Sequence, residues 1–460
     1  MTKINNAWEK YDDNAMKNCM DFNEGYKKFI TDCKTERECV NESIVLAKQR
    51  GYKDLATIIK NKETVKAGDK VYATTMGKAI ALFVVGNEPL ENGMKILGAH
   101  IDSPRLDLKQ HPIYEDHELV LFDTHYYGGI KKYQWVTLPM AMHGVVAKKD
   151  GSLINVVVGE DDCDPVLGIS DLLVHLSADQ MNKAAGKVVE GEDLNVLVGS
   201  IPTKDVEKDK SKATILKLLK EKYNIEEEDF ESAELEIVPA GKARDLGLDR
   251  SMVMGYGHDD RVCAYTSLLA LFDIEKTDRT CVCILVDKEE VGSIGATGMH
   301  SKFFENTVAE LMNCMNQYHD LTLRRALQNS MMLSSDVSAA FDPNYAEVNE
   351  MKNTAFFAHG VTFNKYTGSR GKGGCNDANP EFIAKLRSIM EKHDVTYQTA
   401  ELGRVDQGGG GTIAYITAQY NMEVIDSGVP VQNMHAPWEV VSKADVFEAY
   451  KGYVAFLIEA

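Results

Sequence analysis

Acidic and histidine side chains stand directly after runs of apolar residues, where they could bind a metal ion. His100 and Asp102 end the run KILGAHID. Glu289 and Glu290 follow CVCILVDK, and Asp336 follows MMLSS. Open α/β sheets bind ligands beyond the carboxyl ends of their strands. We therefore expect these side chains to meet in one crevice.

Two further candidates, Asp259 and His435, stand in different surroundings. Asp259 precedes the apolar run RVCAYTSLLALFDI, whose helical spacing places this carboxylate at a helix N-terminus. Asp is also a preferred N-cap residue, so Asp259 and Asp260 could simply cap that helix. His435 comes ten residues after the run MEVI, and by itself it could equally be a core or loop histidine.

The other candidates also have ordinary structural interpretations. His100 and Asp102 form either a metal-binding imidazole oriented by a carboxylate or a loop pair without such a role. Adjacent glutamates such as Glu289 and Glu290 are common on solvated helices. The complete set is more specific, because two histidines and three carboxylates suit a pair of divalent ions, with one carboxylate bridging and positions left for water.

The sequence disfavours nucleophilic catalysis by serine or cysteine, and it disfavours a phosphate-binding loop. There is no G-x-S-x-G motif, and Cys281 and Cys283 lie inside an apolar run, where burial would keep their thiols inert. The run QGGGGT at 407–412 lacks the Lys-Ser/Thr ending of a phosphate-binding loop. We interpret it as backbone that approaches a ligand closely, or as a flexible loop.

Charge and cysteine usage narrow the environment and the partners. The chain has 51 Lys and Arg against 70 Asp and Glu, and the resulting net charge of −19 would repel nucleic acids and anionic membranes. Its nine cysteines include no C-x-x-C pair, which indicates reduced thiols. No export signal and no membrane-spanning stretch is recognisable. We expect a cytoplasmic protein that binds neither nucleic acid nor membrane.

The elements that must position these residues follow from the apolar periodicity. Residues 6–50 have helical spacing and are followed by Gly51 as a stop, which predicts covering helices. From Lys70 onward, short apolar runs predict strands. After residue 250 such runs alternate with helical stretches. This predicts the α/β class, with a mixed twisted sheet covered by helices on both faces.

The stretch between about residues 110 and 245 has a different character. It contains the strand-like runs LVLFDT, GVVAKK and INVVVG, one helical stretch near 171–183, and the charged run KDVEKDKSK, which we interpret as a solvated face or a mobile loop. At 460 residues the chain exceeds what one hydrophobic core organises. We therefore expect a separate β-rich module here.

Five segments together resemble the aspartyl aminopeptidase family, within the wider clan of dinuclear metallo-aminopeptidases. They are GAHIDSPRLDLK (98–109), GHDDRVCAYTSLLAL (257–271), VDKEEVGS (286–293), SSDVSAAFDPNY (334–345) and DSGVPVQNMHAPWEVV (426–441). Each segment is unspecific by itself, but the ordered set is specific and extends over most of the chain.

The resemblance implies a role for each candidate residue. It assigns His100 and Asp336 to one metal ion, Glu290 and His435 to the other, Asp259 to the bridging position, Asp102 to the orientation of His100, and Glu289 to the general base. The family's usual Asp-Asn pair at the bridge is Asp259-Asp260 here. The sequence therefore leaves open which of these two carboxylates bridges, and we choose Asp259 by alignment.

The family resemblance also implies the domain organisation and the assembly. Residues 1–108 and 245–460 would form the catalytic α/β domain, and residues 109–244 an inserted β-rich dimerisation domain. Members form closed dodecamers whose active sites face an inner chamber, so the implied partners are peptides and further copies of the chain. In the family a histidine of the inserted domain can reach a neighbouring subunit's site. His175 is our candidate, with a core helix position as the alternative.

The implied activity is hydrolysis of the N-terminal residue from peptides, with two divalent ions per chain. Zinc is expected, with cobalt and manganese as alternatives. Arg370 and Lys372 lie near the segment where the family places a basic specificity residue, so we expect acidic N-terminal residues to be accepted. The alternatives are a related dinuclear amidase or carboxypeptidase, and a non-catalytic metal-dependent scaffold.

Overall fold

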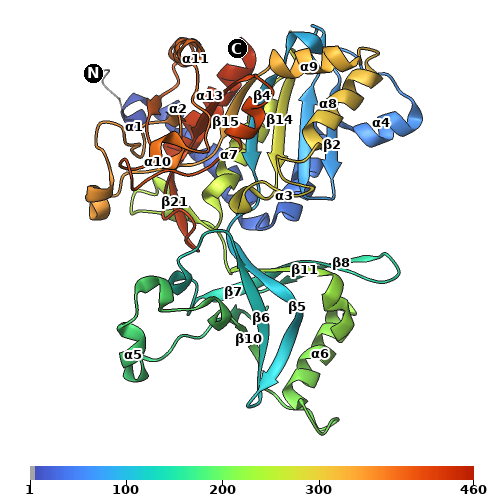
Figure 1. Cartoon of the computed structure of the whole chain (residues 1–460), viewed down its shortest axis with the longest axis vertical. Helices are drawn as coiled ribbons and strands as arrows, with labels where there is room; N and C mark the ends of the chain where they lie inside the picture. Colours follow the sequence, from blue (N-terminus) through green and yellow to red (C-terminus); the bar gives the residue numbers. More distant parts are fainter. Residues whose placement is uncertain (1–5) are drawn as a thin grey trace. The chain divides into compact units, whose positions relative to one another are not determined.

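The computed structural model describes residues 6–460, which divide into two units (Figure 1). The first unit contains the chain up to Asp102 together with Ala243–Met434 and Glu439–Ala460. The inserted unit contains Ser103–Lys242 together with His435–Trp438.

A nine-stranded mixed sheet forms the centre of the first unit. In spatial order its strands are β1 (Lys53–Asp54), β2 (Lys70–Thr75), β3 (Ala79–Val84), β14 (Cys281–Val286), β4 (Lys95–His100), β15 (Met331–Ser335), β19 (Glu423–Gly428), β17 (Val361–Asn364) and β18 (Tyr397–Thr399). Strands β14, β4, β15 and β19 are parallel, whereas β3 and β17 run antiparallel to their neighbours β14 and β19. The predicted mixed sheet is therefore confirmed.

Helices cover both faces of this sheet, as the sequence predicts. One face carries α2 (Asp13–Asp32), α3 (Glu36–Gln49), α7 (His258–Phe272), α11 (Pro380–Lys392) and α13 (Lys443–Glu459), and the other carries α4 (Leu55–Asn61), α8 (Phe303–Cys314), α9 (Asp320–Gln328) and α12 (Ala414–Ala418). Successive side chains of a strand point to opposite faces. Accordingly, Leu97 of β4 joins the core on the first side, and Ile96 joins the core on the second. Full burial of each such side chain contributes roughly 2 kcal/mol.

The N-terminal helices begin and end where the sequence indicates. Helix α1 spans Ala7–Lys10, and Asp12 caps α2 by accepting a hydrogen bond from Ala15 N at 2.7 Å. Thr35 and Glu38 form a capping box at the start of α3. Beyond α3, Gly51 adopts φ +83°, a left-handed conformation that suits glycine and ends the helix.

A second, smaller sheet in the first unit joins segments from distant parts of the chain. Its order is β12 (Arg244–Leu246), β13 (Met252–Gly255), β21 (Glu439–Ser442), β20 (Pro430–Gln432) and β16 (Ser338–Ala339). Strand β13 leads directly into α7, and β21 leads directly into α13.

The inserted unit is built on a seven-stranded antiparallel sheet. Its order is β11 (Ala233–Pro239), β5 (Arg105–Asp116), β6 (Leu119–Tyr127), β10 (Val196–Gly199), β9 (Leu167–Gly168), β7 (Pro139–Ala147) and β8 (Leu153–Val158). Strand β11 pairs with both β5 and β7, so the sheet closes into a barrel-like ring. The expected β-rich character of the module is confirmed.

The helix expected near residues 171–183 is replaced by two shorter elements. The chain forms a 3-10 turn at Val174–Leu176 and the single-turn helix α5 at Ala178–Met181. The module's longer helix, α6 (Lys210–Tyr223), begins inside the charged run that we interpreted as a solvated face or loop. No helix among residues 6–460 has the length and apolar character needed to cross a bilayer.

Candidate active site

Three neighbouring parallel strands end at the same edge of the large sheet. In the register of β14 and β4, Val286 lies opposite His100, and β15 lies on the other side of β4. Glu289 and Glu290 follow β14 in a 3-10 turn, and Asp336 directly follows β15. The sheet therefore delivers these carboxylates and the imidazole to one edge.

His100 lies at the centre of this cluster, and its side chain is buried. Its Nε2 atom is 3.2 Å from Asp259 Oδ1, 4.0 Å from Glu289 Oε2 and 4.0 Å from Asp336 Oδ1. Ligand atoms of His100, Asp259 and Glu290 all lie within 4.8 Å of one another. The same holds for ligand atoms of His100, Asp260 and Asp336.

Asp102 connects the imidazole to the glutamate turn. His100 Nδ1 is 3.0 Å from the Asp102 carbonyl oxygen and 3.4 Å from its Oδ1. The backbone N–H groups of Glu289 and Glu290 each donate to the Asp102 carboxylate at 3.2 Å. A proton on Nδ1 leaves Nε2 as the nitrogen that faces the other carboxylates, which is a common arrangement for a metal-binding histidine.

Asp259 and Asp260 stand near the start of α7, but their backbone angles are not helical: φ −77°, ψ 106° for Asp259 and φ −117°, ψ 25° for Asp260. The regular part of the helix therefore begins at Arg261, directly after the two aspartates. Asp259 N–H donates to Glu439 Oε2 at 3.0 Å, and Asp260 Oδ2 accepts the His100 backbone N–H at 3.4 Å. The peptide bond between the two aspartates is cis.

The electrostatics of the cluster suit a bound cation. Burial raises the pKa of Asp260, and the neighbouring charge of Asp259 raises it further. Burial likewise raises the pKa of Asp336, with Asp260 adding to the effect. Burial opposes protonation of His100, but the adjacent Asp102 and Asp259 carboxylates outweigh it and raise the pKa of this imidazole.

A divalent ion would relieve this concentration of negative charge. Asp260 Oδ1 is buried and has no hydrogen-bond partner among residues 6–460. Buried carboxylates are stable when they are paired or bind a metal. The set of one imidazole and several carboxylates is a donor set that zinc accepts, so the residues present fit the metal.

His435 and His175 lie in the inserted unit. His435 has φ +65°, and its Nδ1 is 2.7 Å from the Gly129 carbonyl oxygen. This contact favours a proton on Nδ1 and a lone pair on Nε2, the form in which a histidine binds metal. His175 is exposed on the 3-10 turn, which differs from the core helix position that was its alternative.

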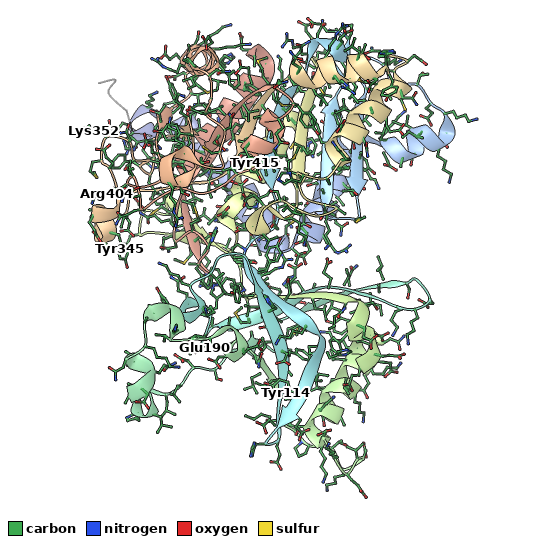
Figure 2. The ribbon with its side chains drawn as sticks, in the orientation of Figure 1. Tyr114, Glu190, Tyr345, Lys352, Arg404 and Tyr415 are labelled. Carbon is green, nitrogen blue, oxygen red and sulfur yellow. The ribbon has the colours of Figure 1, made fainter. Side chains whose placement is uncertain are left out.

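Arg370 and Lys372 line a cavity of about 230 Å³ formed by the loops around residues 366–372 and 401–409. Lys372 Nζ is 3.1 Å from Asp377 Oδ2 and 3.7 Å from the Tyr366 ring centroid. Arg404, labelled in Figure 2, lines the same cavity. Glu401 and Asp406 also line this cavity, and no ion pair joins Arg370 to another of residues 6–460.

The glycine run forms another part of this cavity. A Cβ atom on Gly408 would lie 1.6 Å from the Leu402 carbonyl oxygen, and one on Gly409 would lie 2.6 Å from Ser369 Cα. Gly409 also has φ +117°. Gly408 and Gly409 therefore allow a close approach between two stretches of the protein's own backbone, and the approach of this run to a ligand stays a prediction.

Asp426 is a buried acid near the cluster to which the sequence assigned no role. It lies in β19, and burial raises its pKa to about 7, with the charge of Glu289 adding to the effect. Thr412 Oγ1 donates to Asp426 Oδ1 at 2.5 Å. The available signal was its position near the end of a strand-like run, shared with His100 and Asp336.

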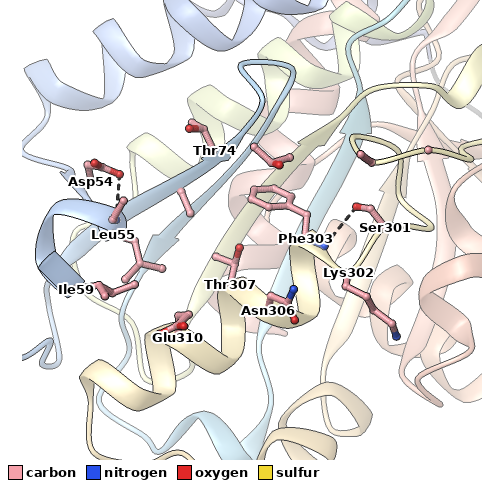
Figure 3. A pocket seen from close by; sticks show the side chains of 15 residues that line it. Asp54, Leu55, Ile59, Thr74, Ser301, Lys302, Phe303, Asn306, Thr307 and Glu310 are labelled. Carbon is pink, nitrogen blue, oxygen red and sulfur yellow. Dashed lines mark hydrogen bonds between the residues drawn. The ribbon is translucent and has the colours of Figure 1, made fainter.

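A larger cavity, of about 680 Å³, lies elsewhere in the first unit (Figure 3). It is bounded by α4, β2 and α8, and Leu55, Thr74 and Phe303 are among the residues that line it. None of the candidate metal ligands lines it. The chemistry of the side chains, and not the size of the cavity, therefore locates the candidate active site.

Comparison with known proteins adds independent evidence. A family profile described as "Aminopeptidase I zinc metalloprotease (M18)" matches residues 29–457. A probable M18 family aminopeptidase 1 of Clostridium acetobutylicum is 64% identical, with 99% of this chain and 98% of the relative covered.

Two solved structures share the fold over nearly the whole chain. Aminopeptidase I from Clostridium acetobutylicum is 62% identical with a TM-score of 0.91, and 99% of each chain is covered. The M18 aminopeptidase from Thermotoga maritima is 39% identical with a TM-score of 0.95, and 100% of each chain is covered. The chain thus belongs to the M18 family of zinc metallo-aminopeptidases, which are peptide hydrolases.

Proposed function

We propose that this aminopeptidase removes the N-terminal residue of peptides with two divalent metal ions and a glutamate general base. The observation that carries the proposal is the pair of overlapping ligand groups that share His100, one with Asp259 and Glu290 and the other with Asp260 and Asp336. A single catalytic zinc typically uses three protein ligands, and this cluster offers more.

The ligand roles combine this geometry with the family resemblance. We assign His100 and Asp336 to one ion and Glu290 to the other, with Asp259 as the bridge. Asp259 is the better bridge because its Oδ1 is 3.2 Å from His100 Nε2, whereas Asp260 Oδ2 already accepts the His100 backbone N–H. The role of His435 as a ligand of the second ion rests on the resemblance alone.

When bound, the metal ions activate water and polarise the scissile carbonyl. Glu289 takes a proton from the attacking water and passes it to the leaving amine. The Asp102 carboxylate keeps Glu289 in place by accepting the Glu289 backbone N–H. The same carboxylate orients His100 by its contact with Nδ1 of the imidazole. The peptide's free α-amino group distinguishes an aminopeptidase substrate from other amides.

Acidic N-terminal residues are the proposed preference, and Arg370 is the stronger of the two basic candidates. Lys372 already pairs with Asp377 at 3.1 Å, whereas no ion pair within residues 6–460 holds the Arg370 guanidinium in its cavity. A guanidinium binds a carboxylate with two parallel hydrogen bonds. If aspartyl substrates were cleaved equally well after both residues were changed to alanine, these residues would have no part in specificity.

The inserted unit is proposed to mediate dimerisation within a closed homo-oligomer, a dodecamer by family resemblance. Its α5 region exposes apolar side chains, among them Val174 at 78%, Leu176 at 67% and Met181 at 72%. Apolar patches of this kind mark interaction surfaces. In such an assembly His175, on the same turn, would reach a neighbouring subunit's site.

The activity is tested with peptides that have either a free or an acetylated N-terminus. The enzyme is first treated with a chelator and then restored separately with zinc, cobalt or manganese. We expect turnover of the free peptide only, and only after metal is restored. Equal cleavage of the acetylated peptide would indicate a different amidase.

A further inference from the structure

The turn that carries Glu289 and Glu290 belongs to the loop 287–297, whose first and last residues contact each other. We call this contact the base of the loop. Asp287 begins this loop directly after β14, and Thr297 lies ten residues further along the chain. Thr297 Oγ1 donates to Asp287 Oδ2 at 2.6 Å, and Asp287 N–H donates to the Thr297 carbonyl at 3.3 Å. Two hydrogen bonds therefore join the two ends of the loop.

The Asp287 carboxylate also holds the residue that precedes Glu289. Asp287 Oδ1 accepts the Lys288 N–H at 2.8 Å, and both Asp287 and Thr297 are buried. Lys288 has φ +73°, a conformation that a residue other than glycine rarely adopts without support. Further support comes from Ser293 N–H, which donates to the Lys288 carbonyl at 2.6 Å.

The Asp287 and Asp102 carboxylates hold consecutive backbone N–H groups of the same turn, those of Lys288, Glu289 and Glu290. Asp102 accepts the backbone N–H groups of Glu289 and Glu290, each at 3.2 Å. Gly298 lets the base close, because a Cβ atom there would lie 2.3 Å from the Ser293 carbonyl oxygen. The hydrogen bonds between Asp287 and Thr297 thus support the turn beside the Asp102 contacts.

We infer that the Thr297 hydroxyl, through its hydrogen bond to Asp287, is a positioning element that sets where Glu289 and Glu290 point. This inference rests on the roles proposed above for the two glutamates. Thr297 is a positioning residue and touches no reacting atom. A displacement of about 1 Å at a catalytic group can cost on the order of a hundredfold in rate.

The test compares three threonine variants of the full-length zinc enzyme. Thr297→Val keeps the side-chain shape and removes the hydroxyl, and Thr297→Ser restores it. Thr417→Val is the matched control, because Thr417 is also buried and its hydroxyl donates to the Ala414 carbonyl of its own helix, at 3.1 Å. Each variant is characterised by kcat, KM, zinc content and melting temperature.

We expect Thr297→Val to lose roughly ten- to a hundredfold in kcat, with KM within about twofold of the parent. Thr297→Ser should return kcat to within about threefold of the parent, and Thr417→Val should keep it. The inference is overturned if Thr297→Val keeps kcat within about twofold, if serine fails to restore it, or if both valine variants lose kcat equally.

Two further variants cover the case in which Thr297→Val does not fold and separate the positioning role from the proposed general base. If Thr297→Val does not fold, Thr297→Ala replaces it, because alanine also lacks the hydroxyl that donates to Asp287. It should lose about tenfold in kcat, and unchanged kcat would overturn the inference. Glu289→Gln, measured in parallel, separates the two claims: full turnover there would reject the proposed base, while kcat loss in Thr297→Val would still support the positioning role.

Discussion

At the level of single residues, the two adjacent glutamates Glu289 and Glu290 are proposed to have different tasks. Glu289 Oε2 lies 4.0 Å from His100 Nε2, and Glu290 belongs to a ligand group with His100 and Asp259. Their backbone N–H groups are held by the same carboxylate, that of Asp102. Substitutions at the two positions should therefore fail in different ways.

Glu289→Gln should separate catalysis from metal binding. The amide keeps the size of the side chain but cannot accept a proton from water. We expect normal zinc content and turnover reduced by roughly a hundred- to ten-thousandfold. Zinc analysis and a peptide-turnover assay on the same samples check this prediction. Full activity of the variant would show that Glu289 is not the general base.

Glu290→Gln should instead weaken the binding of metal. A neutral amide is a poorer ligand than a carboxylate, so the variant should lose zinc at low metal concentration and regain part of its activity in excess zinc. Activity measured across a zinc titration shows this directly. Zinc loss in Glu289→Gln alone would mean that the two roles are exchanged.

Much of the cluster could be predicted because its residues follow strand-like runs in the sequence. His100, Glu289, Glu290 and Asp336 follow apolar runs, and the structure brings them to one sheet edge. Their chemical roles remain predictions. Asp260 was considered only as an alternative, because its contact with the His100 backbone depends on the packing of α7 against β4, which no local pattern reveals.

At the scale of elements, alternation and periodicity predicted the strands and helices of the first unit well. They failed near residues 171–183, where closely spaced apolar residues suggested one face of a helix. In the structure this segment forms a 3-10 turn and one short helix, and several of its apolar side chains are exposed. The spacing of apolar residues indicates that they are buried in some contact, but it does not show whether that contact lies within the same chain.

The start of α7 is stabilised by a buried neutral histidine. His258 Nε2–H donates to the Val253 carbonyl at 3.2 Å, and Nδ1 accepts from the Tyr26 hydroxyl. Burial lowers the pKa of His258 to about 3, and the charge of Arg261 adds to this effect. Protonation of His258 therefore favours the unfolded chain.

This pKa shift predicts that the contribution of His258 to stability is lost in mild acid, whereas the raised pKa values of Asp260, Asp336 and Asp426 act in the opposite direction in chelated protein. His258 contributes stability that is present above its ordinary pKa of 6.5 and is lost as the pH falls toward 3. Each pH unit in this window costs about 1.4 kcal/mol, so about 2 kcal/mol is lost by about pH 5. Urea unfolding of chelated protein at several pH values checks this prediction.

His258→Gln provides the comparison for this measurement, because glutamine forms similar hydrogen bonds without titrating. Between about pH 6.5 and 5, the difference in unfolding free energy between this variant and the parent should shift by about 2 kcal/mol in favour of the variant. Identical pH dependence in the variant and the parent would exclude a contribution from His258.

At the scale of the whole molecule, the exposed apolar residues of the α5 region bear on assembly. Val174→Asp combined with Leu176→Asp would place charges in the proposed interface, where their desolvation is costly. We expect light scattering to show a smaller species than the parent. Leu248→Asp, at a wholly exposed leucine of the first unit, is the matched control. An unchanged mass for the double variant would place the interface elsewhere.

We propose that full activity needs two metal ions per chain, which a zinc titration of chelated enzyme can show. Turnover of a peptide with a free N-terminus is followed as zinc is added, and bound zinc is measured in the same samples. Because the cluster offers more ligands than one catalytic zinc uses, activity should rise until about two zinc ions are bound per chain. Full activity at one bound zinc ion per chain would show that a second metal ion is not required.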